Sequence, residues 1–362
     1  MSKERTVLYV GTFTRPAPYL GETNGEGIYC YEFDAEKLEL KLLSVETGID
    51  SPSYLTVDRS GEYLYSNSEI FGWQEGLVKA YKINSEDGSL EYLNMQPSKG
   101  TLTSYISMDQ TNSFVLVTNY LSGSVVLFRR NLDGSLSEVI DKNQHKGLGA
   151  DPERQEGPHT HCVLVDSNNT FVYVTDLGLD KIFCYRLDME CGKLIYESDV
   201  DVPAGSGPRH FIFNPTEDYA YITCELCAKV AAFKRNKNTG ELILIDTYKT
   251  VPEGFDGEAH CSDIQMTASG KFLYAATRWI DNIAAFKVND DGSLESLGQT
   301  SSLGKTPRNF VIDATDRYLL AGNQDSDNIK VFEINHTDGS LKFTGKTFAV
   351  PTPVCLKFLT IK

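Results

Sequence analysis

The sequence predicts an all-β fold, a seven-bladed β-propeller with four-stranded antiparallel blades, closed where the C-terminal strand joins the N-terminal blade. Three observations indicate this fold. An Asp-Gly turn recurs along the chain, the same order of strands recurs with it, and the two chain ends hold complementary parts of one further unit. No linker or low-complexity tract divides the chain, so we expect residues 1–362 to form a single domain.

The recurring turn is Asp-Gly-Ser-Leu. It stands at residues 87–90, 133–136, 291–294 and 338–341, and looser versions stand at 191–194 and 239–242. Asp-Gly between alternating apolar runs is typical of a β-hairpin, because glycine adopts the positive φ that a tight turn needs. Each copy therefore predicts a hairpin between two strands.

Ahead of each turn the same three segments follow one another: a short apolar strand, an aromatic-rich strand, and a strand ending in an aromatic and a charge. In one copy they are residues 54–58, 63–66 and 78–82, and in another 263–267, 272–275 and 283–287. A polar turn residue ends each first strand, at Asp58, Asp109, Asp166, Asn214, Thr267 and Asp313. These anchors are 46 to 57 residues apart, the spacing of one four-stranded propeller blade.

The two chain ends predict how the ring closes. Residues 6–14, 27–34 and 38–46 supply the second, third and fourth strands of a unit that lacks a first strand, and residues 353–359 supply a first strand alone. Joined, they complete a seventh blade and leave no exposed sheet edge. Two β-sandwiches would not explain these complementary remnants.

Charge and composition exclude several kinds of partner. The net charge is −16 and the pI is near 4.9, which disfavours nucleic acid. No apolar run of about 18 residues is present, so we expect no membrane partner. The N-terminus lacks the pattern of a secretory signal, which predicts a cytoplasmic protein whose eight cysteines are reduced and buried. Cys224 and Cys227, three apart on an expected strand, should face opposite sides. No feature specifies an oligomeric state.

Aligning the repeats reveals two positions where charged residues replace the usual type. Five positions before the anchor, three blades have serine, at 53, 104 and 262, whereas the others have His161, Arg209 and Arg308. Eleven positions after the anchor stand Glu69, Tyr120, Leu177, Glu225, Arg278 and Gln324. The start of one strand and the end of its antiparallel partner lie at the same end of a blade. His161, Arg209, Glu225, Arg278 and Arg308 should therefore converge at one mouth of the channel.

Such a set suits an anionic substrate, because arginine binds phosphate or carboxylate in a planar, bidentate manner and histidine or glutamate can move a proton. The structural alternative is an ion-pair network at the rim. His159 and His161 have the spacing of metal ligands, and His260 and Cys261 could add others, but no complete ligand set is present, so we expect neither metal nor cofactor. No Gly-x-Ser-x-Gly motif is present, which excludes a common α/β serine hydrolase. Residues 146–155 predict a loop that leans over the mouth.

Longer motifs carry a resemblance to a known family. Residues 154–161 (RQEGPHTH), 207–210 (GPRH), 306–310 (TPRNF) and 323–328 (NQDSDN) resemble those of the propeller lactonases, which include bacterial propeller-type 6-phosphogluconolactonases and fungal carboxymuconate lactonising enzymes. The resemblance covers essentially the whole chain. It implies a catalytic set of His161, Arg209, Glu225 and Arg278, and substrate binding by Arg308, His159, His210, Glu69, Asn323 and Gln324.

The chain also departs from the family pattern. Residues 224–226 are Cys-Glu-Leu where family members commonly have Asn-Glu-Leu, and residues 276–279 are Ala-Thr-Arg-Trp where they have Ser-Asn-Arg-Gly. The run His-Cys-Ser-Asp at residues 260–263 is also unusual. The charged residues are retained while the pocket wall differs.

The resemblance implies metal-independent hydrolysis of a small anionic sugar lactone, with 6-phosphoglucono-1,5-lactone, a pentose phosphate pathway substrate, as the leading candidate. Glu225 or His161 would activate water, Arg209 and Arg278 would stabilise the oxyanion, and Arg308 would hold the phosphate. Two alternatives remain: a carboxymuconate-type cycloisomerase using the same arginines, and a scaffold propeller that binds a protein partner.

Overall fold

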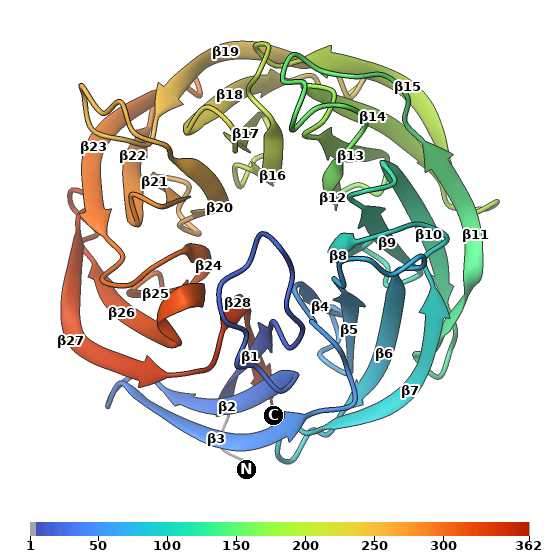
Figure 1. The fold of residues 1–362 in the computed structure, drawn as a ribbon, viewed down its shortest axis with the longest axis horizontal. Helices are drawn as coiled ribbons and strands as arrows, with labels where there is room; N and C mark the ends of the chain where they lie inside the picture. The colour runs from blue at the N-terminus through green and yellow to red at the C-terminus, as the bar shows by residue number, and fades with distance from the viewer. Residues whose placement is uncertain (1–4, 362) are drawn as a thin grey trace.

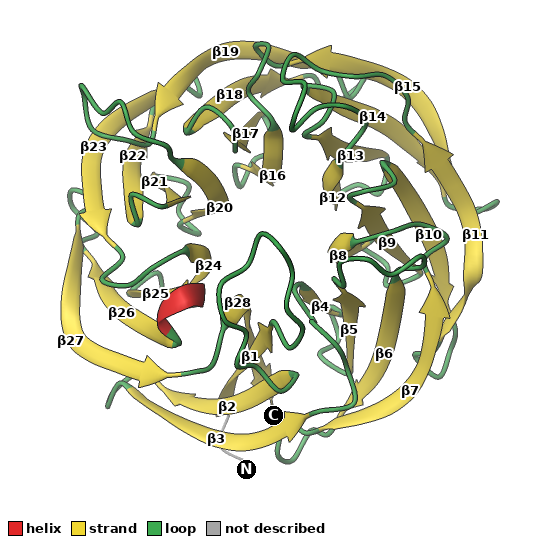
Figure 2. Ribbon diagram, in the orientation of Figure 1, coloured by secondary structure: helices red, strands yellow, loops and turns green. Residues whose placement is uncertain are grey.

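The predicted seven-bladed propeller is confirmed. The computed structural model describes residues 5–361, in which seven four-stranded antiparallel sheets surround a central channel (Figure 1). The described residues contain almost no helix, and the 3-10 turn η1 (Gln324–Ser326) stands out as the one short coil in Figure 2.

The blades are numbered in chain order, and the strands of each blade run from the channel outward. Blade 1 has β28 (Pro353–Ile361), β1 (Arg5–Thr12), β2 (Ile28–Asp34) and β3 (Glu39–Glu46); blade 2 has β4 (Leu55–Val57), β5 (Tyr63–Ser68), β6 (Leu77–Ile83) and β7 (Leu90–Pro97); blade 3 has β8 (Thr103–Met108), β9 (Phe114–Asn119), β10 (Ser124–Arg130) and β11 (Leu136–Gln144). Blade 4 has β12 (Thr160–Val165), β13 (Phe171–Asp176), β14 (Lys181–Asp188) and β15 (Lys193–Asp201); blade 5 has β16 (Pro208–Phe213), β17 (Tyr219–Cys224), β18 (Lys229–Arg235) and β19 (Leu242–Lys249). Blade 6 has β20 (His260–Met266), β21 (Phe272–Arg278), β22 (Asn282–Val288) and β23 (Leu294–Ser301); blade 7 has β24 (Pro307–Ile312), β25 (Tyr318–Asn323), β26 (Asn328–Ile334) and β27 (Leu341–Ala349).

The two chain ends complete blade 1 as predicted. β28 pairs antiparallel with β1, from Arg5 opposite Ile361 to Gly11 opposite Cys355, and takes the channel position of that sheet. The N- and C-terminal strands therefore lie side by side at the bottom of Figure 1. This pairing leaves neither strand as an open edge of the ring.

The recurring glycine turns link neighbouring blades. At each of five blade interfaces, a buried tyrosine on the second strand of one blade donates its hydroxyl hydrogen to a turn carbonyl of the next blade, over 2.7–3.0 Å. The pairs are Tyr9 with Gly88, Tyr65 with Gly134, Tyr173 with Gly240, Tyr221 with Gly292, and Tyr274 with Gly339. The turn motif thus acts twice, because it reverses the chain and also accepts an inter-blade hydrogen bond.

The placement of one cysteine differs from the expectation. Cys224 is the buried last residue of β17, but Cys227 lies in the turn after that strand, so the two residues do not alternate along one strand. The four-residue turn between β17 and β18, which the sequence pattern did not reveal, is the cause. All eight cysteines are free thiols, but Cys191 is exposed and Cys227 is half-buried, whereas both were expected to be buried. Over residues 5–361, no helix is long and apolar enough to cross a membrane.

The inter-blade hydrogen bond predicts a measurable stability effect. We expect Tyr65→Phe to lower the free energy of unfolding by about 1–3 kcal/mol, since it leaves the buried Gly134 carbonyl without its donor. Urea unfolding followed by circular dichroism measures the change. Tyr92→Phe, at a half-exposed tyrosine, is the matched control and should alter stability little. Equal effects of the two substitutions would contradict the role of the bond.

Candidate active site

Bulges in the channel strands aim the site residues into the mouth of the channel. In blades 3 to 7 the pairing between the first and second strands skips at the position five before the turn anchor, and in blade 1 it skips at Val354. In blade 4, Thr160 pairs with Asp176 and Cys162 with Thr175, so His161 is unpaired. Arg308 is skipped in the same way in blade 7. A bulge re-aims the extra side chain, which explains how a residue at this position can face the site.

Threonines on the second strands hold these bulges in place. Thr118 Oγ1 donates to the His161 carbonyl at 3.1 Å, and Thr175 Oγ1 donates to the Arg209 carbonyl at 2.6 Å. In each pair the threonine belongs to the preceding blade. The backbone of each site residue is therefore positioned by its neighbouring blade as well as its own.

Glu225 lies at the centre of the site, in the turn that follows β17. Its carboxylate oxygens form ion pairs with three arginines, at 2.8 Å from Arg154 Nη2, 3.0 Å from Arg209 Nε and 2.8 Å from Arg278 Nη2. Burial alone would raise the pKa of the Glu225 carboxyl, but the three guanidinium groups outweigh it and hold that pKa well below its usual value. Glu225 therefore stays ionised at neutral pH.

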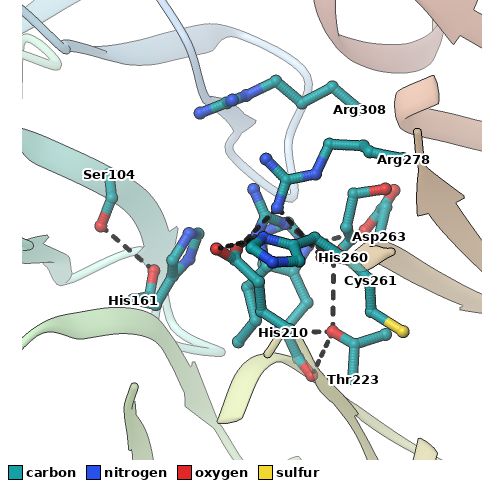
Figure 3. A network of polar contacts seen from close by, with 12 residues as sticks. Ser104, His161, His210, Thr223, His260, Cys261, Asp263, Arg278 and Arg308 are labelled. Atoms are coloured by element: carbon teal, nitrogen blue, oxygen red, sulfur yellow. Dashed lines mark hydrogen bonds and ion pairs between the residues drawn. The ribbon is translucent and has the colours of Figure 1, made fainter. Parts of the chain in front are cut away.

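His161 faces this cluster across the channel. Figure 3 shows its ring on one side of the site, with Arg278 and Arg308 extending toward the centre from the other. Burial, reinforced by the charge of Arg209, holds the pKa of His161 well below its usual value. Nδ1 is buried and has no hydrogen-bond partner within residues 5–361. At neutral pH His161 is thus an uncharged imidazole beside four cations.

Arg308 forms the other side of the site. Its Nη2 lies 3.2 Å from Glu69 Oε1, and its guanidinium carbon lies 4.8 Å from the centre of the Phe13 ring. Tyr19, from the loop between β1 and β2, donates its hydroxyl hydrogen to the same Glu69 oxygen at 3.4 Å. That loop reaches over the centre of the ring in Figure 1.

Arg154 is a site residue that the repeat alignment missed, because it lies on no strand. It belongs to the loop between β11 and β12, which leans over the mouth as predicted. Asp176 holds both ends of this loop: its carboxylate contacts His145 Nδ1 at 2.6 Å and accepts the His159 backbone N–H at 2.7 Å. The reach of Arg154 to Glu225 depends on this anchoring.

These side chains line one pocket of about 350 Å³. Its polar lining includes four arginines and two glutamates, namely Arg154, Arg209, Arg278, Arg308, Glu69 and Glu225. The pocket therefore carries excess positive charge in a chain whose net charge is −16. An anion gains from such a field, and partial burial strengthens each ion pair.

Four residues predicted to bind substrate do not line this pocket, and three of them, His159, Asn323 and Gln324, line no neighbouring cavity either. The His159 ring stacks on Tyr120 at a centroid distance of 4.7 Å, and its Nε2 lies 3.2 Å from Glu156. Asn323 donates its amide to the Ser302 carbonyl at 3.2 Å. Gln324 lies in η1, where its amide donates to the Asp325 carboxylate at 2.8 Å. Their polar groups thus support the loops and turns around the mouth.

His210, also predicted to bind substrate, lies in a second, smaller cavity. This cavity of about 10 Å³ is also lined by His161 and Arg209. His210 Nδ1 lies 2.8 Å from the buried Asp263 carboxylate, and the His161 and His210 ring centres are 5.2 Å apart. Burial and the charge of Arg209 lower the pKa of His210 well below its usual value, so a neutral histidine pair lies under the pocket.

Within residues 5–361, no group of three or more histidine, cysteine, aspartate or glutamate side chains is arranged to hold a metal ion. His260, one of the candidate ligands, instead packs against Trp279, with ring centres 4.1 Å apart, and its Nδ1 lies 3.8 Å from Glu225. Burial lowers the pKa of His260 to about 4.

Comparisons of the sequence and of the fold with known proteins all lead to lactonases. A family model described as lactonase, seven-bladed β-propeller, matches residues 7–358. The chain is 37% identical to the 6-phosphogluconolactonase of Bacillus subtilis over 97% of each chain. It is 31% identical to the 6-phosphogluconolactonase of Formosa agariphila, over 92% of this chain and 94% of the other. The solved structure of a periplasmic gluconolactonase from Pseudomonas aeruginosa is similar with a TM-score of 0.91 and 28% identity, over 99% of this chain and all of the other.

The central position of Glu225 predicts a strong effect of removing its charge. We expect Glu225→Gln to destabilise the protein by about 3–5 kcal/mol, because three buried guanidinium groups lose their shared counter-ion. Added phosphate should restore part of this loss, so the melting temperature of the variant should rise with phosphate more than that of the unmodified protein.

Differential scanning fluorimetry with and without phosphate measures both effects. Glu217→Gln is the matched control, since Glu217 also pairs with a buried arginine, Arg235, but outside the pocket. An equal response of both variants to phosphate would contradict an anion-binding role for the Glu225 cluster.

Proposed function

Since the chain belongs to the lactonase family of seven-bladed β-propellers, we propose that it hydrolyses an anionic sugar lactone, with 6-phosphoglucono-1,5-lactone as the leading substrate. The observation that carries the proposal is the convergence of four arginines and a neutral histidine on one pocket. Such a site offers charge for an anionic substrate and a base that is free at neutral pH. The eight free thiols fit the reducing cytoplasm, which we propose as its compartment.

His161 is the better of the two candidate bases. Glu225 already forms ion pairs with three guanidinium groups, and its lowered pKa makes it a weak proton acceptor. His161 is uncharged at neutral pH, lines the same pocket and makes no hydrogen bond through Nδ1 among the described residues. In this proposal Glu225 positions the arginines and His161 accepts the proton.

Arg278 is suited to stabilise the oxyanion. Its Nη2 is bound to Glu225, but its Nε is buried and has no hydrogen-bond acceptor within residues 5–361. A buried unpaired donor is costly unless a ligand accepts from it. Arg209 is more fully engaged, because its Nη1 also donates to the Ser262 carbonyl at 2.7 Å. Arg209 therefore contributes mainly charge and positioning.

The proposed reaction follows from these roles. A water oxygen attacks the lactone carbonyl carbon while His161 accepts one water proton. The carbonyl oxygen becomes an oxyanion, which the Arg278 N–H and the surrounding positive charge stabilise. The ring C–O bond then breaks, and the histidine returns its proton to the leaving alkoxide oxygen. Arg308, which enters the site from blade 7, holds the phosphate.

This assignment predicts the effects of His161→Gln. We expect kcat for 6-phosphoglucono-1,5-lactone to fall about 10²–10⁴-fold, the usual contribution of a general base. In the unmodified protein, activity should persist below pH 6.5 and fall only as pH drops through the lowered pKa of His161, because the base must be unprotonated. Initial rates corrected for spontaneous hydrolysis test both. His336→Gln is an exposed control, and unchanged activity in His161→Gln would rule His161 out as the base.

Arg308 should distinguish phosphorylated from neutral lactones. We expect Arg308→Ala to raise KM for 6-phosphoglucono-1,5-lactone at least about tenfold, since a charged hydrogen bond contributes about 1.5–3 kcal/mol. KM for glucono-1,5-lactone, which has no phosphate, should change little. Steady-state kinetics measure KM for both lactones. Arg317→Ala, at an exposed arginine, is the control. Equal KM increases for the two lactones would place the phosphate elsewhere.

A further inference from the structure

The mouth of the pocket differs in character from its charged floor. Four apolar side chains on the pocket wall are between 41% and 51% exposed: Tyr19, Phe71, Leu121 and Trp279. Tyr19 and Phe71 contact each other edge to face, with ring centres 6.0 Å apart. Nothing in the hydrolytic mechanism requires this exposed aromatic surface, and the charged groups alone do not account for it.

Trp279 is the most unusual of these residues, because its backbone adopts a left-handed conformation with φ of 72°. The propeller supplies an internal comparison. In blades 3 to 7 a turn of four residues lies between the last residue of the second strand that pairs with the third strand and its partner, and the last turn residue is left-handed in every case. At the second turn position, where Leu121, Gly178, Leu226 and Asp325 stand in the other blades, only Trp279 has positive φ.

A bulky side chain in this conformation is strained, and such strain persists where the surroundings enforce it, commonly at functional sites. Here Asp281 enforces it: one of its oxygens accepts the backbone N–H of Trp279 at 3.1 Å and that of Thr306 at 2.8 Å. The indole packs on His260 and remains 51% exposed. The turn thus holds an aromatic ring at the pocket mouth, directly beside Arg278.

We infer that Trp279 is the stacking platform of a sugar-ring subsite, which holds the C–H face of a pyranose while the anionic arm of the same molecule lies on the arginines. A pyranose ring carries C–H groups on its faces and hydroxyls around its edge, so it fits a flat aromatic surface beside a polar floor. Phe71 and Tyr19 line the pocket mouth as well. The inference rests on the proposed function and adds the ring form of the substrate as a specificity determinant.

The subsite predicts a difference between cyclic and open-chain ligands. D-Glucose 6-phosphate has the ring and phosphate but no lactone to hydrolyse, and D-sorbitol 6-phosphate has the phosphate on an open chain. We expect Trp279→Ala to weaken glucose 6-phosphate binding about threefold to tenfold, the range of an aromatic contact. Sorbitol 6-phosphate binding should change less than twofold. Isothermal titration calorimetry measures all four affinities.

The chain offers a matched control in its second tryptophan. Trp73 is 43% exposed and does not line the pocket, so Trp73→Ala should affect neither ligand. In a Trp73→Phe background Trp279 is the only tryptophan, and glucose 6-phosphate should change its fluorescence. If Trp279→Ala weakens the binding of glucose 6-phosphate and sorbitol 6-phosphate equally, or leaves both affinities unchanged, the sugar-ring subsite is overturned while the proposed function stands. If the unmodified protein binds neither of these sugar phosphates, both the subsite and the proposed function are overturned.

Backbone strain at residue 279 can be tested separately. Trp279→Gly and Trp279→Ala both remove the ring, but only glycine accepts positive φ without strain. We expect Trp279→Gly to melt about 1–3 °C above Trp279→Ala, with ring discrimination lost in both. Equal melting temperatures, or a more stable alanine variant, would overturn the argument that the turn is strained to present the indole.

Discussion

The pairing of β28 with β1 is the constraint on which the rest of the structure depends. These strands lie at opposite ends of the chain, and their register, from Arg5 opposite Ile361 to Gly11 opposite Cys355, closes the ring. Closure gives every blade two neighbours, so each blade can anchor the next through buried hydrogen bonds. Residues from blades that are distant in sequence then meet at one channel mouth.

Within that frame, Glu225 sets the electrostatics of the site. A buried carboxylate between three arginines costs desolvation, which only well-made ion pairs offset. Burial, together with the charge of Arg209 from the same cluster, lowers the pKa of His161 and keeps it neutral. One ion cluster therefore has two consequences: it leaves Glu225 a poor base and His161 an available one. Because the pocket has more arginines than glutamates, it keeps a net positive charge that an anionic substrate can neutralise.

The internal repeats made much of the site predictable. Equivalent positions share a place on the blade, so the alignment of anchors located His161, Arg209, Glu225 and Arg278, and the structure brings these four to one pocket. The alignment did not show why these positions face the channel, because a bulge depends on strand pairing rather than on residue type. It also did not separate pocket residues from supporting ones, and His159, Asn323 and Gln324 hold loops and turns instead.

The sequence by itself determined the seven-bladed ring, its closure and the columns that bear charge, because turns, strand order and repeat spacing are local properties of the chain. Tertiary structure alone decided the place of Arg154, the neutrality of His161 and the strained backbone of Trp279. The reach of a loop depends on distant anchors such as Asp176. A pKa depends on burial and on charges from other blades, and no repeat pattern encodes either of these.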